Sequence, residues 1–264
     1  MRIVVCVKHV PDVQSERRIE AGRVVRGEDD VLNELDENAI EAGVELVERF
    51  GGECVALTMG PQDAEEAVMR ALQMGADRGI LVSDDQLAGA DAIGTARVLH
   101  AAINRIASEQ PVDMVITGMA SLDGMTSMLP SALAAMLGMP HLGLAHSIEV
   151  DQVEGAYQVD IERSADGFED TLRSTTPLLV SVTDQLNEPR FPTFAAMKAA
   201  HTKPLEQWEL TDLDSYAQGA VLSEHIAAVS VDAAQPAPLR CAGTVITDSG
   251  DGGTRLAAYL KEVL

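Results

Sequence analysis

The sequence predicts an α/β protein in which a mostly parallel sheet is flanked by helices, with a hairpin addition and an extended C-terminal tail. Two observations on the first half of the chain predict this class: its short apolar runs and the amphipathic stretches between them. In the first half, short runs that are apolar at nearly every residue alternate with longer stretches whose apolar residues recur at helical spacing. Continuous apolar runs are typical of strands buried on both faces of a sheet. The length of 264 residues is enough to bury a substantial core.

Four buried strands are predicted in the first half, and amphipathic helices connect them. The second of these helices opens after Gly60-Pro61, because proline favours a first helical turn, and the third opens at Asp91, a residue suited to capping. The predicted strands cover residues 3–7, 54–58, 79–82 and 114–117, and the helices follow residues 33–36 as far as 50, then cover 63–75 and 91–108.

The second half changes character. Short alternating segments around Gly155 and Gly167 predict the hairpin addition, and a proline-rich polar segment, 184–204, is too long for an ordinary connection. Residues 205–264 are weakly patterned and are predicted to form an extended arm, so residues 1–204 make the α/β domain. The other predicted elements are a helix at 126–138, strands at 148–150, 157–163, 171–173 and 178–183, and a short helix at 254–263.

Composition excludes several classes of function. Lys and Arg number 19 against 42 Asp and Glu, a formal charge of −23 that repels nucleic acids and anionic membrane surfaces. The three cysteines are far apart, and Cys6 and Cys54 lie in apolar runs, which predicts reduced core thiols. The chain has neither an apolar run of ~18 residues nor a leader pattern before its first strand. A bacterial cytoplasmic location is therefore expected.

Candidate binding residues lie in the loops that follow the strands, because open parallel sheets bind ligands beyond the carboxyl ends of their strands. These loops are residues 8–12, 59–61 and 118–128. The last joins a buried strand to a helix, so free N–H groups at the helix start could hold a phosphate, helped by the Thr126 and Ser127 hydroxyls. The alternative is an ordinary capped helix. Neither the Gly-x-Gly-x-x-Gly fingerprint nor the Walker lysine loop is present.

Catalytic patterns are missing from the sequence. The six histidines are dispersed without metal-ligand spacing, and no Gly-x-Ser-x-Gly elbow exposes a nucleophile, so neither a metal site nor an enzyme is expected. In the proline-rich segment, Phe191 and Phe194 are held between rigid prolines. Exposed aromatic residues of this kind suit an anchor for a partner protein, although both rings could instead enter the core.

Three segments together resemble the beta subunit of electron transfer flavoprotein: residues 4–12, 71–78 and 186–192. The Asp-Gly-Gly at 251–253 resembles the tail of an actinobacterial branch. The resemblance implies a nucleotide-binding fold like that of adenine nucleotide alpha hydrolases. It also implies a heterodimer whose alpha subunit, contacted by the 205–264 arm, holds most of the FAD, while the beta subunit binds AMP structurally. Such a protein is an electron carrier that takes electrons from acyl-CoA and other dehydrogenases, as in fatty acid oxidation, and passes them to a quinone oxidoreductase.

The resemblance also implies two sets of functional residues. The cofactor-binding set is Cys6, Asn33, Glu34, Leu35, Asp36, Met59, Gly118, Asp123, Gly124, Met125, Thr126, Ser127, Met128 and Leu129. The partner-binding set, in a recognition loop that docks dehydrogenases with Phe194 as its apolar anchor, is Leu186, Asn187, Glu188, Pro189, Arg190, Phe191, Phe194 and Met197.

The sequence departs from the family pattern at several of these positions. Met125 and Met128 stand where polar residues usually approach the phosphate, so main-chain donors would have to suffice. Val13 and Leu35 replace aromatic residues that approach the flavin in some members. The recognition loop is one residue shorter than usual, and the lysines after it are reduced to Lys198 and Lys203.

Three alternatives stay open. A flavin-bifurcating relative would hold a second FAD in place of AMP. An adenine-nucleotide-binding, ATP-hydrolysing α/β protein would commonly carry a Ser-Gly-Gly-x-Asp-Ser-type loop where residues 8–12 stand, and this loop is missing. A stress-type nucleotide-binding module would lack redox function and a flavin-bearing partner.

Overall fold

The computed structural model describes residues 1–15, 18–20, 22–27, 29–153, 155–219, 221–235, 238, 243, 245 and 247–263. The chain forms two compact units, Met1–Ala233 and Ala234–Leu264. None of the helices in the described ranges is long and apolar enough to cross a membrane. The first unit contains the sheet and every site considered below, and the second is treated by itself.

The core of the first unit is a seven-stranded parallel sheet in the order β14-β7-β6-β1-β8-β13-β9, which confirms the predicted α/β class. Its three central strands are buried along nearly their whole length, as their continuous apolar runs predict. The strands span Arg2–Cys6 (β1), Glu53–Met59 (β6), Arg78–Val82 (β7), Met114–Gly118 (β8), His141–Ala145 (β9), Leu178–Val182 (β13) and Leu205–Trp208 (β14).

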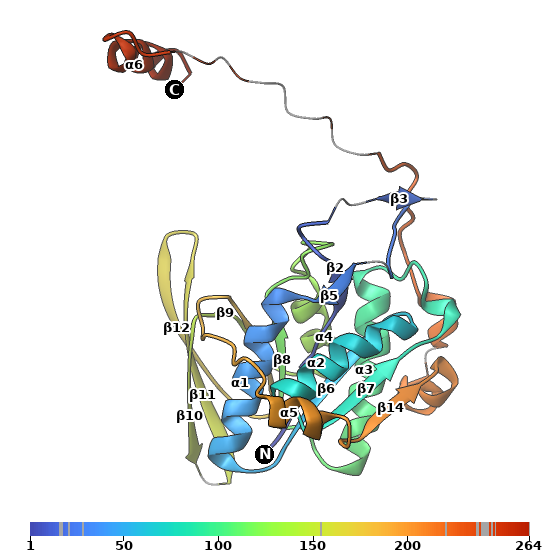
Figure 1. The fold of residues 1–264 in the computed structure, drawn as a ribbon. Coiled ribbons are helices and arrows are strands. Elements are labelled where there is room, and N and C mark those ends of the chain that lie inside the picture. Colours follow the sequence, from blue (N-terminus) through green and yellow to red (C-terminus); the bar gives the residue numbers. More distant parts are fainter. Residues whose placement is uncertain are drawn as a thin grey trace. The chain divides into compact units, whose positions relative to one another are not determined.

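Helices cover both faces of this sheet (Figure 1). Alternate residues of β1 show the division: Ile3 and Val5 face α1 and α2, whereas Val4 and Cys6 face α3 and α4. Asp91 caps α3 by accepting a bond from Gly94 N, as predicted. The helices span Glu34–Phe50 (α1), Glu65–Met74 (α2), Ala92–Glu109 (α3), Leu129–Leu137 (α4) and Phe194–Ala200 (α5).

The expected hairpin addition is a three-stranded antiparallel sheet, made of Ser147–Val153 (β10), Ala156–Ala165 (β11) and Phe168–Thr175 (β12). It joins the main body through apolar residues of its inner face, and the Tyr157 ring meets Phe50 of α1 edge-on with the ring centroids 5.4 Å apart. Two small ladders follow β1 in the sequence: His9–Pro11 (β2) pairs with Asp30–Leu32 (β5), and Ile19–Glu20 (β3) pairs with Arg23–Val24 (β4).

The structure corrects the sequence analysis in the second half of the chain. Strand β9 was not predicted, α5 lies inside the segment expected to be a loop, and β14 lies inside the expected arm. Because β14 pairs with β7 and Trp208 is buried, the compact unit runs to Ala233 and does not end at residue 204. The helix expected from residue 126 begins at Leu129.

The second unit contains the helix Gly252–Val263 (α6), which covers the predicted terminal helix. Its apolar side chains recur at helical spacing and are exposed at Leu256, Tyr259, Leu260 and Val263. Asp248 accepts bonds from Gly250 N and Gly252 N just before the helix. Cys241 lies outside the described residues, whereas Cys6 and Cys54 are free, buried thiols as predicted.

Candidate functional site

The carboxyl ends of β1 and β8 meet the start of α1, and Asn33 links them. Its Nδ2 donates to the Ala120 carbonyl at 3.0 Å, and its Oδ1 accepts from Leu122 N at 3.0 Å. At its own end of α1, Asn33 makes no side-chain capping bond within the described residues. The side-chain amide of Asn33 is fully buried, and both of its hydrogen bonds hold the loop after β8 against the start of α1.

Asp36, in the first turn of α1, lies between the two strand ends. Its Oδ2 accepts from Lys8 N at 2.8 Å, and Gly118 N also donates to the carboxylate. Burial raises the pKa of Asp36 to about 7, although hydrogen bonds from Asn33, Lys8 and Gly118 act in the opposite direction. Burial, followed by the charge of Asp36, raises the pKa of the neighbouring Cys6 thiol to about 12, so Cys6 is an unreactive thiol at neutral pH.

We expect Asp36 to make the protein less stable as pH rises. Its pKa is about 7 in the folded chain against 3.8 as its ordinary value, so between these pH values the folded chain holds a proton that the unfolded chain has lost. The free energy of unfolding should therefore fall by up to ~1.4 kcal/mol per pH unit from this group. Urea unfolding at pH 4.5 to 8 should show a shallower fall for Asp36→Asn than for the wild type.

The exposed Asp184 provides the control for this measurement, because Asp184→Asn removes a carboxylate in solvent. Its profile should follow that of the wild type. Parallel profiles for Asp36→Asn and the wild type would contradict a raised pKa at Asp36.

A second carboxylate, that of Asp123, forms ion pairs with two cationic side chains. Lys8 Nζ lies 2.8 and 2.9 Å from its two oxygens, and Arg26 Nη2 pairs with Oδ2. Arg26 also donates from Nη1 to the His9 carbonyl at 3.1 Å. Burial would raise the pKa of Asp123, but the two cations outweigh it and hold the pKa well below its usual range. This triad, Lys8–Asp123–Arg26, fixes the start of the loop 118–128 and has a net positive charge in a chain of charge −23.

The rest of that loop is open to solvent. Residues 124–128 are exposed, Met125 and Ser127 have φ values of 48° and 50°, and Met128 has the right-handed conformation that leads into α4. A left-handed residue followed by a right-handed one turns successive N–H groups to one side, an arrangement that binds anions. The main chain therefore supplies the donors that Met125 and Met128 lack.

A buried hydroxyl beside this loop also fits a ligand. Thr117 is the register partner of Cys6, so the two side chains lie side by side on the α3/α4 face near the strand ends. Thr117 Oγ1 has no hydrogen-bond partner among the described residues, although Thr117 is 4% exposed. A buried polar atom without a partner calls for a ligand or a water molecule. The main-chain donors and this hydroxyl together fit a small anionic molecule with a polar body.

The structure thus brings most of the predicted cofactor set to one place, the strand-end site formed by residues 6–8, 33–36 and 117–128. Met59 ends β6, the neighbour of β1, but the described bonds do not connect it to the loop. Glu34 and Leu35 lie in the first turn of α1, beside Asn33 and Asp36 in the sequence. Sequence reasoning missed Arg26 and Thr117. Nothing local indicates Arg26, which lies 97 residues from its partner Asp123.

The predicted partner segment divides into two parts. Asn187 and Arg190 turn toward α1, where they meet Asn38 and Glu41. Phe191 and Phe194 turn away from the core and are 89% and 80% exposed, so neither ring enters the core. Met197, in α5, is 37% exposed. A cavity of about 300 Å³ lies between α1, the start of β10 and residues 186–187.

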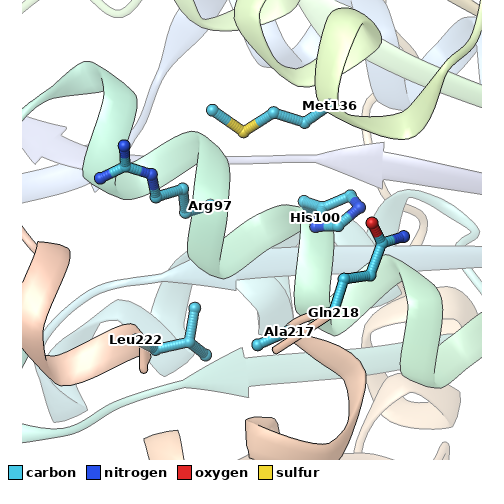
Figure 2. Close-up of a pocket in the computed structure, with 6 residues that line it drawn as sticks. All are labelled: Arg97, His100, Met136, Ala217, Gln218 and Leu222. Atoms are coloured by element: carbon cyan, nitrogen blue, oxygen red, sulfur yellow. The ribbon is translucent and has the colours of Figure 1, made fainter. Parts of the chain in front are cut away.

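A second cavity, of about 290 Å³, lies away from the strand ends, between α3, α4 and residues 217–222. Figure 2 shows Arg97 and His100 projecting from α3, with the Gln218 amide beside the imidazole and Met136 above it. Burial lowers the pKa of His100, which favours the neutral ring. In the part of the chain that the structure describes, no group of three or more His, Cys, Asp and Glu residues is placed to hold a metal ion.

Fold and site together define a class: an open parallel α/β protein with a cluster of polar groups at the carboxyl ends of its central strands. Comparison with known proteins narrows the class. The electron transfer flavoprotein domain matches residues 21–213. The chain is 35% identical to the electron transfer flavoprotein subunit beta of Mycobacterium leprae (strain TN) over 98% of this chain and 97% of the relative. It is 32% identical to the subunit of the same name in Bacillus subtilis (strain 168) over 81% of each chain.

The chain is also 34% identical to Protein FixA of Bradyrhizobium diazoefficiens, over 80% of this chain and 74% of that protein. The chain therefore belongs to the electron transfer flavoprotein family, and within it to the beta subunits.

Proposed function

We propose that this chain is the beta subunit of a heterodimeric electron carrier, in which an alpha subunit holds most of the FAD and this chain binds AMP and completes the flavin surroundings. Family membership supports the carrier role. The observation that carries the AMP proposal is the strand-end site, where the loop after β8 has exposed main-chain N–H groups at 126–128 and begins directly after the unpartnered Thr117 hydroxyl.

In this proposal the chain's own residues bind and orient. The N–H groups at 126–128 receive the phosphate of AMP, and Thr117 contacts its polar body. Asn33 and Asp36 hold the start of α1 against the loop after β8 and the end of β1. The bound flavin supplies the electron chemistry, and the protein supplies position and electrostatics. Val13 and Leu35 give the flavin an aliphatic neighbourhood where some members have aromatic rings.

The exposed apolar side chains of the partner segment and of α6 contact other proteins in this proposal. Phe191 and Phe194 form an apolar contact for an electron-donating flavin dehydrogenase, of which acyl-CoA dehydrogenases are the first candidates, and a quinone oxidoreductase is the proposed acceptor. In the second unit, α6 carries its own exposed apolar stripe, which suits a contact with the alpha subunit. A cytoplasmic location is part of the same proposal.

Co-expression with a candidate flavin-bearing alpha subunit tests this function. We expect a yellow 1:1 complex that releases one FAD and one AMP on denaturation, measured by absorbance and mass spectrometry. Release of two FAD molecules and no AMP would instead identify the complex as a flavin-bifurcating relative with a second FAD in place of AMP. A colourless monomer that pairs with none of the candidate subunits would overturn the proposal.

Phe194→Ala should raise the KM of the complex for electron uptake about tenfold, because truncating a central aromatic anchor removes docking energy. FAD content and kcat should stay within about twofold, since the side chain is exposed and α5 lies at the opposite end of the sheet from β2 and β5 (Figure 1). The measurement is steady-state reduction of the complex by an acyl-CoA dehydrogenase supplied with its acyl-CoA. Phe168→Ala, which removes another exposed ring at the tip of the β11–β12 hairpin, is the matched control. Equal kinetics for the two variants would count against Phe194 as an anchor.

A further inference from the structure

Arg190 makes six hydrogen bonds to two glutamates of α1. Its backbone N and its Nε and Nη2 atoms donate to the Glu41 carboxylate at 2.9 to 3.0 Å. Its Nη1 and Nη2 donate to the Glu48 carboxylate at 2.6 and 3.0 Å. A fork that meets two carboxylates in this way is among the strongest and most directional contacts that a side chain can make.

The two glutamates differ in burial, and Glu41 is the critical one. The side chain of Glu41 is 6% exposed, whereas that of Glu48 is 58% exposed. A buried carboxylate is costly unless it is paired. Moving Arg190 away would leave the Glu41 charge buried without its partner, so the pairing keeps Arg190 in place. Glu45 stands between them on the same helix, and burial and the charge of Glu41 raise its pKa.

Asn187 adds a second attachment three residues earlier. The Asn38 amide donates to the Asn187 carbonyl at 2.9 Å and to its Oδ1 at 3.0 Å, and Asn187 Nδ2 donates back to the Asn38 carbonyl at 3.1 Å. Asn38 is 5% exposed. The exchange of bonds in both directions fixes the backbone of the segment on α1.

The far side of the segment is also fixed. Thr193 Oγ1 caps α5 by accepting from Ala196 N at 3.2 Å, and Ala200 is buried in the core shared with α1 and α2. Lys203 Nζ donates to two carbonyls at the end of α2, those of Leu72 and Ala76. Phe191 and Phe194 therefore lie between two anchored points, and Phe191 follows Arg190 directly in the chain.

We infer that Arg190 is a positioning residue: it does not contact the electron-transfer partner but holds the exposed Phe191–Phe194 pair in its docking conformation through Glu41 and Glu48. The inference rests on the docking role proposed for this pair, and it reassigns Arg190 and Asn187 from the contact set implied by the family resemblance. Rigid presentation favours affinity, because a contact that is already ordered loses less conformational entropy on binding.

The first test needs no partner. Hydrogen–deuterium exchange of the full chain should show amides of residues 187–193 exchanging about tenfold faster in Arg190→Gln than in the wild type, with the β1 and β8 peptides unchanged. Arg173→Gln is the matched control, because it removes an exposed arginine that makes bonds of 2.6 Å to both oxygens of Asp160. Unchanged exchange at 187–193 in Arg190→Gln would overturn the inference.

The second test measures docking with the flavin-loaded complex and an acyl-CoA dehydrogenase. Arg190→Gln should raise KM about five- to tenfold and leave kcat and FAD content within about twofold, and Arg190→Lys should recover part of the loss. If Arg190→Gln does not fold, Glu48→Gln tests the exposed half of the contact with a smaller expected rise in KM.

The combinations of outcomes separate this inference from the proposed function. A raised KM in Phe194→Ala together with an unchanged KM in Arg190→Gln would overturn the positioning role alone. Unchanged KM in both variants would overturn the docking role on which it rests. A raised KM in Arg190→Gln with unchanged exchange at 187–193 would make Arg190 a contact residue.

Discussion

Gly118→Ala should lower the free energy of unfolding by about 3 kcal/mol and abolish binding of the proposed AMP. A Cβ at Gly118 would lie 2.5 Å from Asp36 Oδ1 and 2.8 Å from the Leu35 carbonyl oxygen. The second contact is with backbone of the first turn of α1, so side-chain rotation cannot relieve it. The start of α1 has to move away from β8, which breaks the hydrogen bond between Asn33 and Ala120 and disrupts the strand-end site.

Gly124→Ala is the matched control, because it adds the same methyl group in the same loop. The atom nearest to a Cβ there is Ser121 Oγ at 3.3 Å, the end of a small side chain. We expect a change below about 1 kcal/mol in urea unfolding, and the same content of the proposed AMP as in the wild type. Equal losses in the two variants would show that the loop tolerates no methyl group anywhere, and full AMP content in Gly118→Ala would refute the role given to this close approach.

Trp208→Ala should cost about 3 to 4 kcal/mol, the range of large aromatic truncations in a core. Trp208 ends β14 and is 2% exposed, and the Arg105 guanidinium lies 4.0 Å from its ring centroid. Its Nε1 donates to Glu206 at 3.1 Å. Removing the ring leaves a cavity under Leu210 and Leu213, which share its core, and loosens the strand from β7.

Thermal and urea unfolding measure this loss, and hydrogen exchange locates it. Amides of β14 and residues 210–216 should exchange faster, while the β8 and β13 peptides keep their protection. Trp208→Phe preserves most of the packing and should lose less than half as much stability. A uniform rise in exchange across the sheet, or equal stability losses in both variants, would contradict a local attachment.

The central strands could be predicted because their own residues contain the signal for a buried strand. Runs such as Ile3–Val7 and Met114–Thr117 are apolar at every or nearly every position, and only a strand buried on both faces suits so short a run. The helices between them show one apolar stripe each. Both signals are local, so no knowledge of the neighbouring elements was needed.

The missed elements lie at the sheet edges and in the partner segment, where local sequence is ambiguous. Strand β14 reads Leu-Glu-Gln-Trp and β9 reads His-Leu-Gly-Leu-Ala, and each becomes a strand through its pairing with β7 or β13. Helix α5 has seven residues, too few to show a helical period. Its start is set by the Thr193 cap and its packing on α2.

In the candidate site too, position along the chain could be predicted, whereas contacts between distant segments could not. Strand-end position identified Gly118 and the loop after it, because a parallel sheet places the carboxyl ends of its strands at one edge. Asn33 and Asp36 came only from the family resemblance. The pairing of Asp123 with Lys8 and Arg26 could not be found, since it joins segments 115 and 97 residues apart. The inward turn of Arg190 was missed for the same reason, because Glu41 lies 149 residues earlier.

The two edges of the main sheet carry features that oppose self-association. On one side β14 offers four residues, and Glu206 on it is occupied by Arg78 and Trp208. On the other side the register of β9 shifts near Leu144, whose φ is 63° and whose N–H is taken up by Ser181 Oγ. Short or irregular edges are poor templates for intermolecular β-pairing. The sheet therefore stops at seven strands, and neither edge offers a long regular ladder from which an aggregate could grow.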